Sequence, residues 1–77
     1  MNITMYTKSN CPNCTAAKQL LKSKNLQYDE YWIDANPEAE KRMRDAGIRQ
    51  MPAIYINDQY VGGFAGLKVA LNQLELL

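Results

Sequence analysis

The chain has 77 residues and a formal net charge of +1, from nine Lys and Arg against eight Asp and Glu. This balance argues against nucleic-acid binding, which requires concentrated positive charge. No basic segment followed by an apolar one opens the chain, and no apolar run approaches the ~18–20 residues that span a bilayer, so we expect neither a secreted nor a membrane protein.

The length and the cysteine content predict one small domain in a reducing compartment. Seventy-seven residues are close to the minimum for a single hydrophobic core, so most apolar residues must be buried. A small extracellular domain is expected to carry several disulfides, whereas this chain has only two cysteines. We therefore expect a single domain over residues 1–77 and a cytoplasmic location.

A Cys-x-x-Cys pair lies between the first predicted strand and the first predicted helix. Residues 3–7 form an apolar, β-prone run without Gly or Pro, as expected of a buried strand. Cys11 and Cys14 follow at the start of a helical pattern, where residues three apart share a face and come within disulfide range. In this setting the pair predicts a dithiol–disulfide redox centre.

The position of each cysteine predicts its role. Pro12 suits the first helical position, which places Cys11 at the N-cap, beside unpaired backbone N–H groups and the positive end of the helix dipole. These groups and the cation of Lys8 favour a thiolate, so we assign Cys11 as the attacking sulfur. Cys14 lies one turn further along and is more shielded, which suits the resolving sulfur.

Two other interpretations of the pair are weaker. A structural disulfide that closes so short a loop adds little chain-entropy stabilisation. A zinc site needs about four ligands, and the chain offers two cysteines and no histidine. We therefore expect no metal site.

Helix and strand patterns alternate after the cysteine pair. Residues 12–24 predict a helix whose buried stripe continues from Cys14 through Ala17, Leu20 and Leu21. Residues 26–33 are rich in aromatic side chains and predict a second strand, in which Trp32 is interpreted as packing and not as a platform for substrate. The lysines expected to face outward from the helix are Lys18, Lys22 and Lys24.

The second helix is predicted over residues 36–46. Asn36 suits its N-cap, Pro37 suits the first helical position, and Gly47 ends it. Its charged residues are expected to face solvent, although one of its arginines could bind an anionic ligand. The buried face is predicted to contain Ala39, Met43 and Ala46.

The last part of the chain predicts a β-hairpin and a helix. Residues 53–56 and 59–61 are strands joined by an Asn57-Asp58 turn, and Pro52 is tolerated because it begins a strand. The final helix has a buried stripe. The resulting order, β-α-β-α-β-β-α, predicts an α/β fold with one four-stranded mixed sheet flanked by helices. The stripe consists of Leu67, Ala70, Leu71 and Leu74.

Three separated motifs resemble those of the glutaredoxins, which have the thioredoxin fold. They are Tyr-Thr-Lys-Ser-Asn-Cys-Pro-Asn-Cys at residues 6–14, Met51-Pro52 before the third strand, and Gly62-Gly63 before the last helix. The resemblance implies a cis peptide at Met51-Pro52 against the cysteine pair, with the Met51 backbone available to an extended thiol peptide. It implies that the substrate-binding residues are Lys8, Asn13, Met51, Pro52, Gly63, Phe64 and Ala65.

The chain departs from the glutaredoxin pattern in two places. Glutaredoxins usually have Tyr at the position of Asn13, and an acidic residue after the double glycine, where this chain has Phe64-Ala65-Gly66. The NrdH-redoxins are similar to glutaredoxins but are reduced by thioredoxin reductase. They often carry a stretch like residues 48–52 and share a Gly-Phe step with residues 63–64, so the sequence lies between the two groups.

The resemblance implies a monomeric thiol-disulfide oxidoreductase with no tightly bound cofactor. Glutathione would be the co-substrate, with Lys8 near one of its carboxylates, and protein or mixed disulfides would be the substrates, with ribonucleotide reductase as one candidate. Two alternatives remain open. One is an NrdH-type redoxin reduced by thioredoxin reductase, and the other is an iron–sulfur carrier in which two chains use Cys11 and two glutathiones as ligands, a role that Pro12 disfavours.

Overall fold

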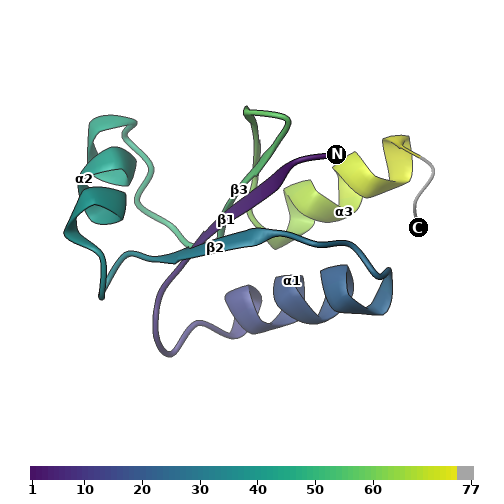
Figure 1. The fold of residues 1–77 in the computed structure, drawn as a ribbon, viewed down its shortest axis with the longest axis horizontal. Coiled ribbons are helices and arrows are strands. Elements are labelled where there is room, and N and C mark those ends of the chain that lie inside the picture. Colours follow the sequence, from purple (N-terminus) through teal and green to yellow (C-terminus); the bar gives the residue numbers. More distant parts are fainter. Residues whose placement is uncertain (75–77) are drawn as a thin grey trace.

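The computed structural model describes residues 1–74 and confirms the predicted order of elements. Figure 1 shows these elements along the chain, with α2 at one end of the view and α3 at the other. No helix within these 74 residues is both long and apolar enough to cross a membrane. The elements are β1 (Ile3–Thr7), α1 (Pro12–Ser23), β2 (Asp29–Trp32), α2 (Pro37–Asp45), β3 (Ala53–Ile56), β4 (Gln59–Gly62) and α3 (Phe64–Gln73).

The four strands form one mixed sheet in the order β2-β1-β3-β4, which is the sheet of the thioredoxin fold. β1 is parallel to β2 and antiparallel to β3, and β3 is antiparallel to β4. α1 makes the crossover between the parallel pair, as a parallel connection requires. In the β1–β2 register Thr7 is opposite Trp32, so the ends of both strands point toward the cysteine pair that follows β1.

Helices cover both faces of the sheet. Alternate residues of β1 point to opposite sides, so β1 contributes side chains to the core on each face. Ile3 and Met5 pack with apolar residues of α1, α3 and β3 in one buried cluster. Tyr6 points to the other face and packs with α2. This second cluster also contains both cysteines and Met51, so the redox pair is attached to the core. The α2 residues in it are Ala39 and Met43.

Several predicted boundaries and buried positions were wrong. β2 begins at Asp29 and not at residue 26, because Asn25 has a φ of 57° and Leu26 donates its backbone N–H to Leu21, which extends the turn after α1. Ala46 is exposed because it is the C-cap of α2, where Gly47 takes a φ of 73°. Leu74 is 50% exposed, since it caps α3 and does not continue its buried stripe.

The predicted hairpin turn is confirmed at Asn57 and Asp58. Their φ angles are 52° and 66°, and a two-residue turn of type I′ needs positive φ at both positions. Asn57 also ties the turn to the N-terminus, because its side chain accepts a hydrogen bond from the Asn2 backbone at 2.9 Å. The turn therefore fixes the register of β3 against β4, and its bond to Asn2 holds the hairpin close to the start of β1.

Asn36→Ala tests the predicted cap of α2. The Asn36 side chain accepts hydrogen bonds from the backbone N–H groups of Glu38 at 3.1 Å and Ala39 at 3.3 Å. Its loss is expected to lower the free energy of unfolding by about 1 kcal/mol and Tm by roughly 4–8 °C. Thermal unfolding followed by circular dichroism measures the shift. Asn36→Asp keeps an acceptor and should retain Tm, and equal Tm values for all three proteins would contradict this role.

Candidate active site

Cys11 and Cys14 form a disulfide at the N-terminus of α1, with their Cα atoms 5.2 Å apart. Cys11 is the N-cap, with φ −122° and ψ 98°, and Pro12 occupies the first turn, as predicted. The backbone N–H of Cys14 donates to Sγ of Cys11 at 3.1 Å. A hydrogen bond to sulfur at a helix N-terminus stabilises negative charge there, so the local geometry favours a thiolate on Cys11 once the pair is reduced.

The two sulfurs differ in their surroundings. Cys14 is 1% exposed and Cys11 is 9% exposed, although both belong to the same buried cluster. Cys14 lies within the first turn of α1, which shields its sulfur, whereas Cys11 lies at the tip of the helix. An incoming disulfide therefore meets Cys11 first.

Met51 and Pro52 lie beside Cys11, and the peptide bond between them is cis, as the resemblance implied. Sγ of Cys11 is 3.5 Å from the backbone oxygen of Met51. Gly63 adjoins this step, because a Cβ on Gly63 would lie 3.4 Å from the backbone oxygen of Pro52. The structure therefore brings the middle and last motifs of the sequence together at the β3 side of the cysteine pair.

A pocket of about 550 Å³ lies on the β2 side of Cys11. Its lining includes Lys8, Cys11 and Cys14, which the sequence predicted as site residues, and Lys18 and Trp32, which it did not. Trp32 is 39% exposed, so the side chain that the sequence interprets as packing is only partly buried. The ring lies at the end of β2, and part of its surface is open to the pocket.

Lys18 was predicted to face outward, and this was wrong, because its side chain belongs to a polar network beside this pocket. Its Nζ is 2.8 Å from a carboxylate oxygen of Glu30 and 4.5 Å from the centre of the Trp32 ring. The same oxygen of Glu30 accepts a hydrogen bond from the buried hydroxyl of Thr7 at 2.9 Å. The network links α1 to β1 and β2. The helical spacing of Lys18 in the sequence does not predict these contacts.

The loop before Cys11 is held against the segment after β2. The carboxylate of Asp34 accepts a hydrogen bond from the backbone N–H of Ser9 at 2.9 Å. Hydrogen bonds from the side chain and the backbone of Ser9 lower the pKa of Asp34 below its usual value. Asn10 has a φ of 56°, which asparagine adopts more readily than most residues. These features fix the direction from which the chain enters Cys11.

Six of the predicted site residues do not line the pocket that contains Cys11; Met51, Pro52 and Gly63 lie on the β3 side, and Asn13, Phe64 and Ala65 lie on the helices. Asn13 is exposed on the first turn of α1, and Ala65 is exposed on the first turn of α3. Phe64 is partly buried against the core, with Nζ of Lys68 5.2 Å from the centre of its ring. A substrate that contacts these three residues would therefore have to reach the first turns of α1 and α3.

The chain matches the family model for glutaredoxins over residues 3–61. The chain belongs to the glutaredoxin family. It is 46% identical over 63 residues to a probable glutaredoxin of Synechocystis, with 79% of this chain and 72% of the relative covered. A glutaredoxin-like protein NrdH of Salmonella typhimurium is 34% identical over 64 residues, covering 83% of this chain and 79% of the relative.

A solved structure of an NrdH-redoxin is also similar to this chain. The glutaredoxin-like protein NrdH-redoxin from Escherichia coli superimposes with a TM-score of 0.83 and 31% identity, over 96% of this chain and 95% of that one. The glutaredoxin family and the Cys11–Cys14 disulfide together identify the protein as a thiol-disulfide oxidoreductase. Its likeness to both glutaredoxins and NrdH proteins agrees with its mixture of motifs.

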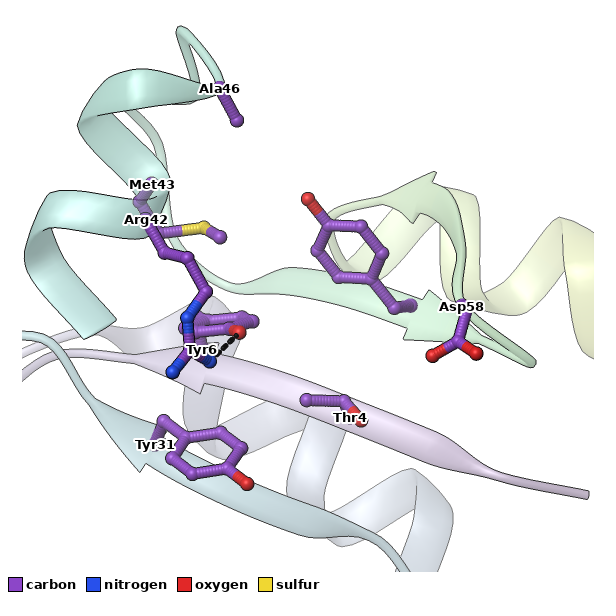
Figure 2. A pocket seen from close by; sticks show the side chains of 8 residues that line it. Thr4, Tyr6, Tyr31, Arg42, Met43, Ala46 and Asp58 are labelled. Carbon is purple, nitrogen blue, oxygen red and sulfur yellow. Dashed lines mark hydrogen bonds between the residues drawn. The ribbon is translucent and has the colours of Figure 1, made fainter. Parts of the chain in front are cut away.

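A second pocket, of about 390 Å³, lies on the face of the sheet that carries α2 (Figure 2). Arg42 points into it and donates a hydrogen bond to the Tyr6 hydroxyl at 2.7 Å. This bond raises the pKa of Arg42. The guanidinium also lies 5.7 Å from the centre of the Tyr31 ring. Arg42, one of the two α2 arginines that the sequence suggested for an anionic ligand, thus contacts tyrosines of the sheet.

Proposed function

We propose that the protein is a glutathione-dependent dithiol oxidoreductase that reduces protein and mixed disulfides. The observation that carries the proposal is the hydrogen bond from the Cys14 N–H to Sγ of Cys11 at the tip of α1. It supports Cys11 as the nucleophile, because the same donor that contacts sulfur in the disulfide can stabilise a thiolate in the reduced protein. The buried Cys14 then has the resolving role.

The reaction follows from these two roles. The Cys11 thiolate attacks one sulfur of the substrate disulfide, which forms a mixed disulfide and releases the other substrate half as a thiolate that takes up a proton. Cys14 then loses its proton and attacks Sγ of Cys11. This step releases the second half as a thiol and leaves the Cys11–Cys14 disulfide, so two electrons pass to the substrate. Two glutathione molecules reset the pair and become glutathione disulfide.

Residues on both sides of Cys11 would hold the substrate. The backbone of Met51, at the cis step to Pro52 and next to Cys11, would bind an extended thiol peptide as an added strand, which needs no particular side chain. Gly63 has no Cβ, so no side chain lies against the backbone oxygen of Pro52 at this place. Lys8 lines the Cys11 pocket and provides a cation for a glutathione carboxylate. Asn13, Phe64 and Ala65 would form the outer contacts.

A second candidate is an NrdH-type redoxin, in which thioredoxin reductase replaces glutathione as the electron donor. Ala65 favours it, because the first turn of α3 offers no carboxylate to the glutathione amino group. The Escherichia coli relative is described as having a thioredoxin-like activity profile. The chemistry at Cys11 and Cys14 is the same in both candidates. In either case we propose a cytoplasmic protein, with ribonucleotide reductase as one possible acceptor of its electrons.

The electron donor is tested by NADPH consumption during reduction of a disulfide substrate. One assay contains glutathione and glutathione reductase, and the other contains thioredoxin reductase alone. We expect turnover in the glutathione assay, since the potentials of glutaredoxins, about −200 to −230 mV, lie close to that of cytosolic glutathione. Turnover with thioredoxin reductase only would replace this proposal by the second candidate.

Ala65→Asp tests the glutathione site. Ala65 is exposed in the first turn of α3, where the helix dipole favours a carboxylate, so the fold should tolerate the change. One charge-assisted hydrogen bond to the glutathione amino group contributes about 1.5 kcal/mol, or roughly a tenfold lower KM for glutathione. Steady-state reduction of a glutathionylated peptide at several glutathione concentrations measures it. Ala65→Asn adds similar bulk without charge and should leave KM close to the wild-type value. A flat response to Ala65→Asp would argue against glutathione binding at α3.

A further inference from the structure

Cys11 lies between two different walls. β1 leads to Cys11, and the sheet order places β3 on one side of β1 and β2 on the other. On the β3 side, the backbone of Met51 is 3.5 Å from Sγ of Cys11. On the β2 side, the 550 Å³ pocket is lined by Trp32 and Lys18. A polypeptide that presents its disulfide to Cys11 has chain on both sides of the bond, so it can contact both walls.

The wall on the β2 side carries an exposed indole that is held in place. Trp32 is opposite Thr7 in the β1–β2 register, and the backbone N–H of the next residue, Ile33, donates to Thr7 at 2.9 Å. Lys18 lies 4.5 Å from the ring centre and is itself fixed by Glu30 at 2.8 Å. A ring that is already ordered loses little entropy when a partner binds, and exposed tryptophans are frequent centres of binding energy.

We propose that Trp32 and Lys18 form a subsite for an apolar side chain next to the disulfide cysteine of a polypeptide substrate. The inference rests on the proposed function and adds a substrate class to it. Glutathione consists of glutamate, cysteine and glycine, so it has no apolar side chain for the indole. The subsite therefore distinguishes protein disulfides with an apolar neighbour from glutathione disulfides and from peptides with a polar neighbour.

Two peptide disulfides that differ in one residue test the subsite. Each is a glutathionylated cysteine peptide, with Phe beside the cysteine in one and Ser in the other. The readout is the ratio of kcat/KM for the Phe peptide to that for the Ser peptide. An aromatic contact of this kind corresponds to a wild-type ratio of about 3 to 10. Trp32→Ala should bring the ratio to about one, and Trp32→Phe, which keeps a ring, should restore most of it.

Tyr60→Ala is the matched control. Tyr60 is also an exposed aromatic, at 48%, but it lies on β4 and does not line the Cys11 pocket. Its loss should leave the ratio at the wild-type value. A wild-type ratio near one, or a ratio that survives Trp32→Ala, overturns the proposal. Failure of the wild type to reduce either peptide would instead overturn the proposed function, so the two failures are distinguishable.

Fluorescence provides a direct measurement, because Trp32 is the single tryptophan of the chain. In a Cys14→Ser variant, the Phe peptide and the Ser peptide can each be trapped on Cys11 as a mixed disulfide. The Phe adduct should shift the Trp32 emission to shorter wavelength, because an apolar side chain displaces water from the ring. Identical emission spectra for the two adducts would overturn the proposal, even if the kinetic ratio fell.

Discussion

Cys11→Ser is expected to reduce disulfide-reductase activity to background, a loss of at least about a thousandfold. Serine keeps the N-cap geometry and accepts the hydrogen bond from Cys14, but its hydroxyl does not ionise to a nucleophile at neutral pH. Reduction of a glutathionylated peptide, coupled to NADPH consumption, measures the loss. Circular dichroism controls for folding, and the fold should persist. Substantial turnover by a folded Cys11→Ser protein would contradict the assignment.

Cys14→Ser separates the two sulfurs and is the matched control for this variant. It keeps the attacking thiol, so it should still form mixed disulfides but lose the intramolecular step that releases a protein substrate. With glutathione adducts it should retain turnover, because a second glutathione can attack the mixed disulfide on Cys11. If both cysteine variants lost all activity toward glutathione adducts, attack by Cys11 alone would not be sufficient.

Gly66→Ala is expected to have the largest effect on stability. Gly66 lies in the first turns of α3, where it packs directly on β4, and a Cβ there would overlap the backbone carbonyl of Val61. Backbone cannot rotate away as a side chain can, so α3 or β4 must shift. We expect a loss of about 2–3 kcal/mol, which lowers Tm by roughly 10–20 °C for a domain of this size.

The same helix provides the control for Gly66→Ala. Val69 is 57% exposed on α3, and Val69→Ala should change stability by no more than about 0.5 kcal/mol. Urea unfolding of the two variants beside the wild type compares them. A Gly66→Ala protein that is as stable as Val69→Ala would show that α3 does not approach β4 as closely as the structure has it.

Local signals in the sequence predicted much of the fold. The Asn36 cap, the Asn57-Asp58 turn and the N-cap position of Cys11 each depend on a few neighbouring residues, and all three are confirmed. The boundary of β2 was wrong because its aromatic composition extends beyond the residues that can pair with β1. Pairing depends on the turn after α1, which the composition of residues 26–28 does not reveal.

Features that depend on contact between distant segments could not be predicted from the sequence. Trp32 was predicted to pack because aromatic residues in strands usually do, but at the end of β2 it stays 39% exposed, with Lys18 of α1 over its ring. Lys18 fits the polar side of a helix, and only the crossover to β2 brings it to Glu30. Gly66 occupies an ordinary helical position, so its close approach to Val61 has no local signature. The cysteines could be assigned from the sequence, because the Cys-x-x-Cys spacing itself indicates a redox pair.

The central claim is that Cys11 is the sulfur that attacks. Mass spectrometry of the two single-cysteine variants after exposure to a glutathionylated peptide tests it most directly, with the adduct located by proteolysis. We expect a mixed disulfide on Cys11 in the Cys14→Ser protein and little or none on the buried Cys14 in the Cys11→Ser protein. An adduct on Cys14, with none on Cys11, would contradict the account and reverse the two roles.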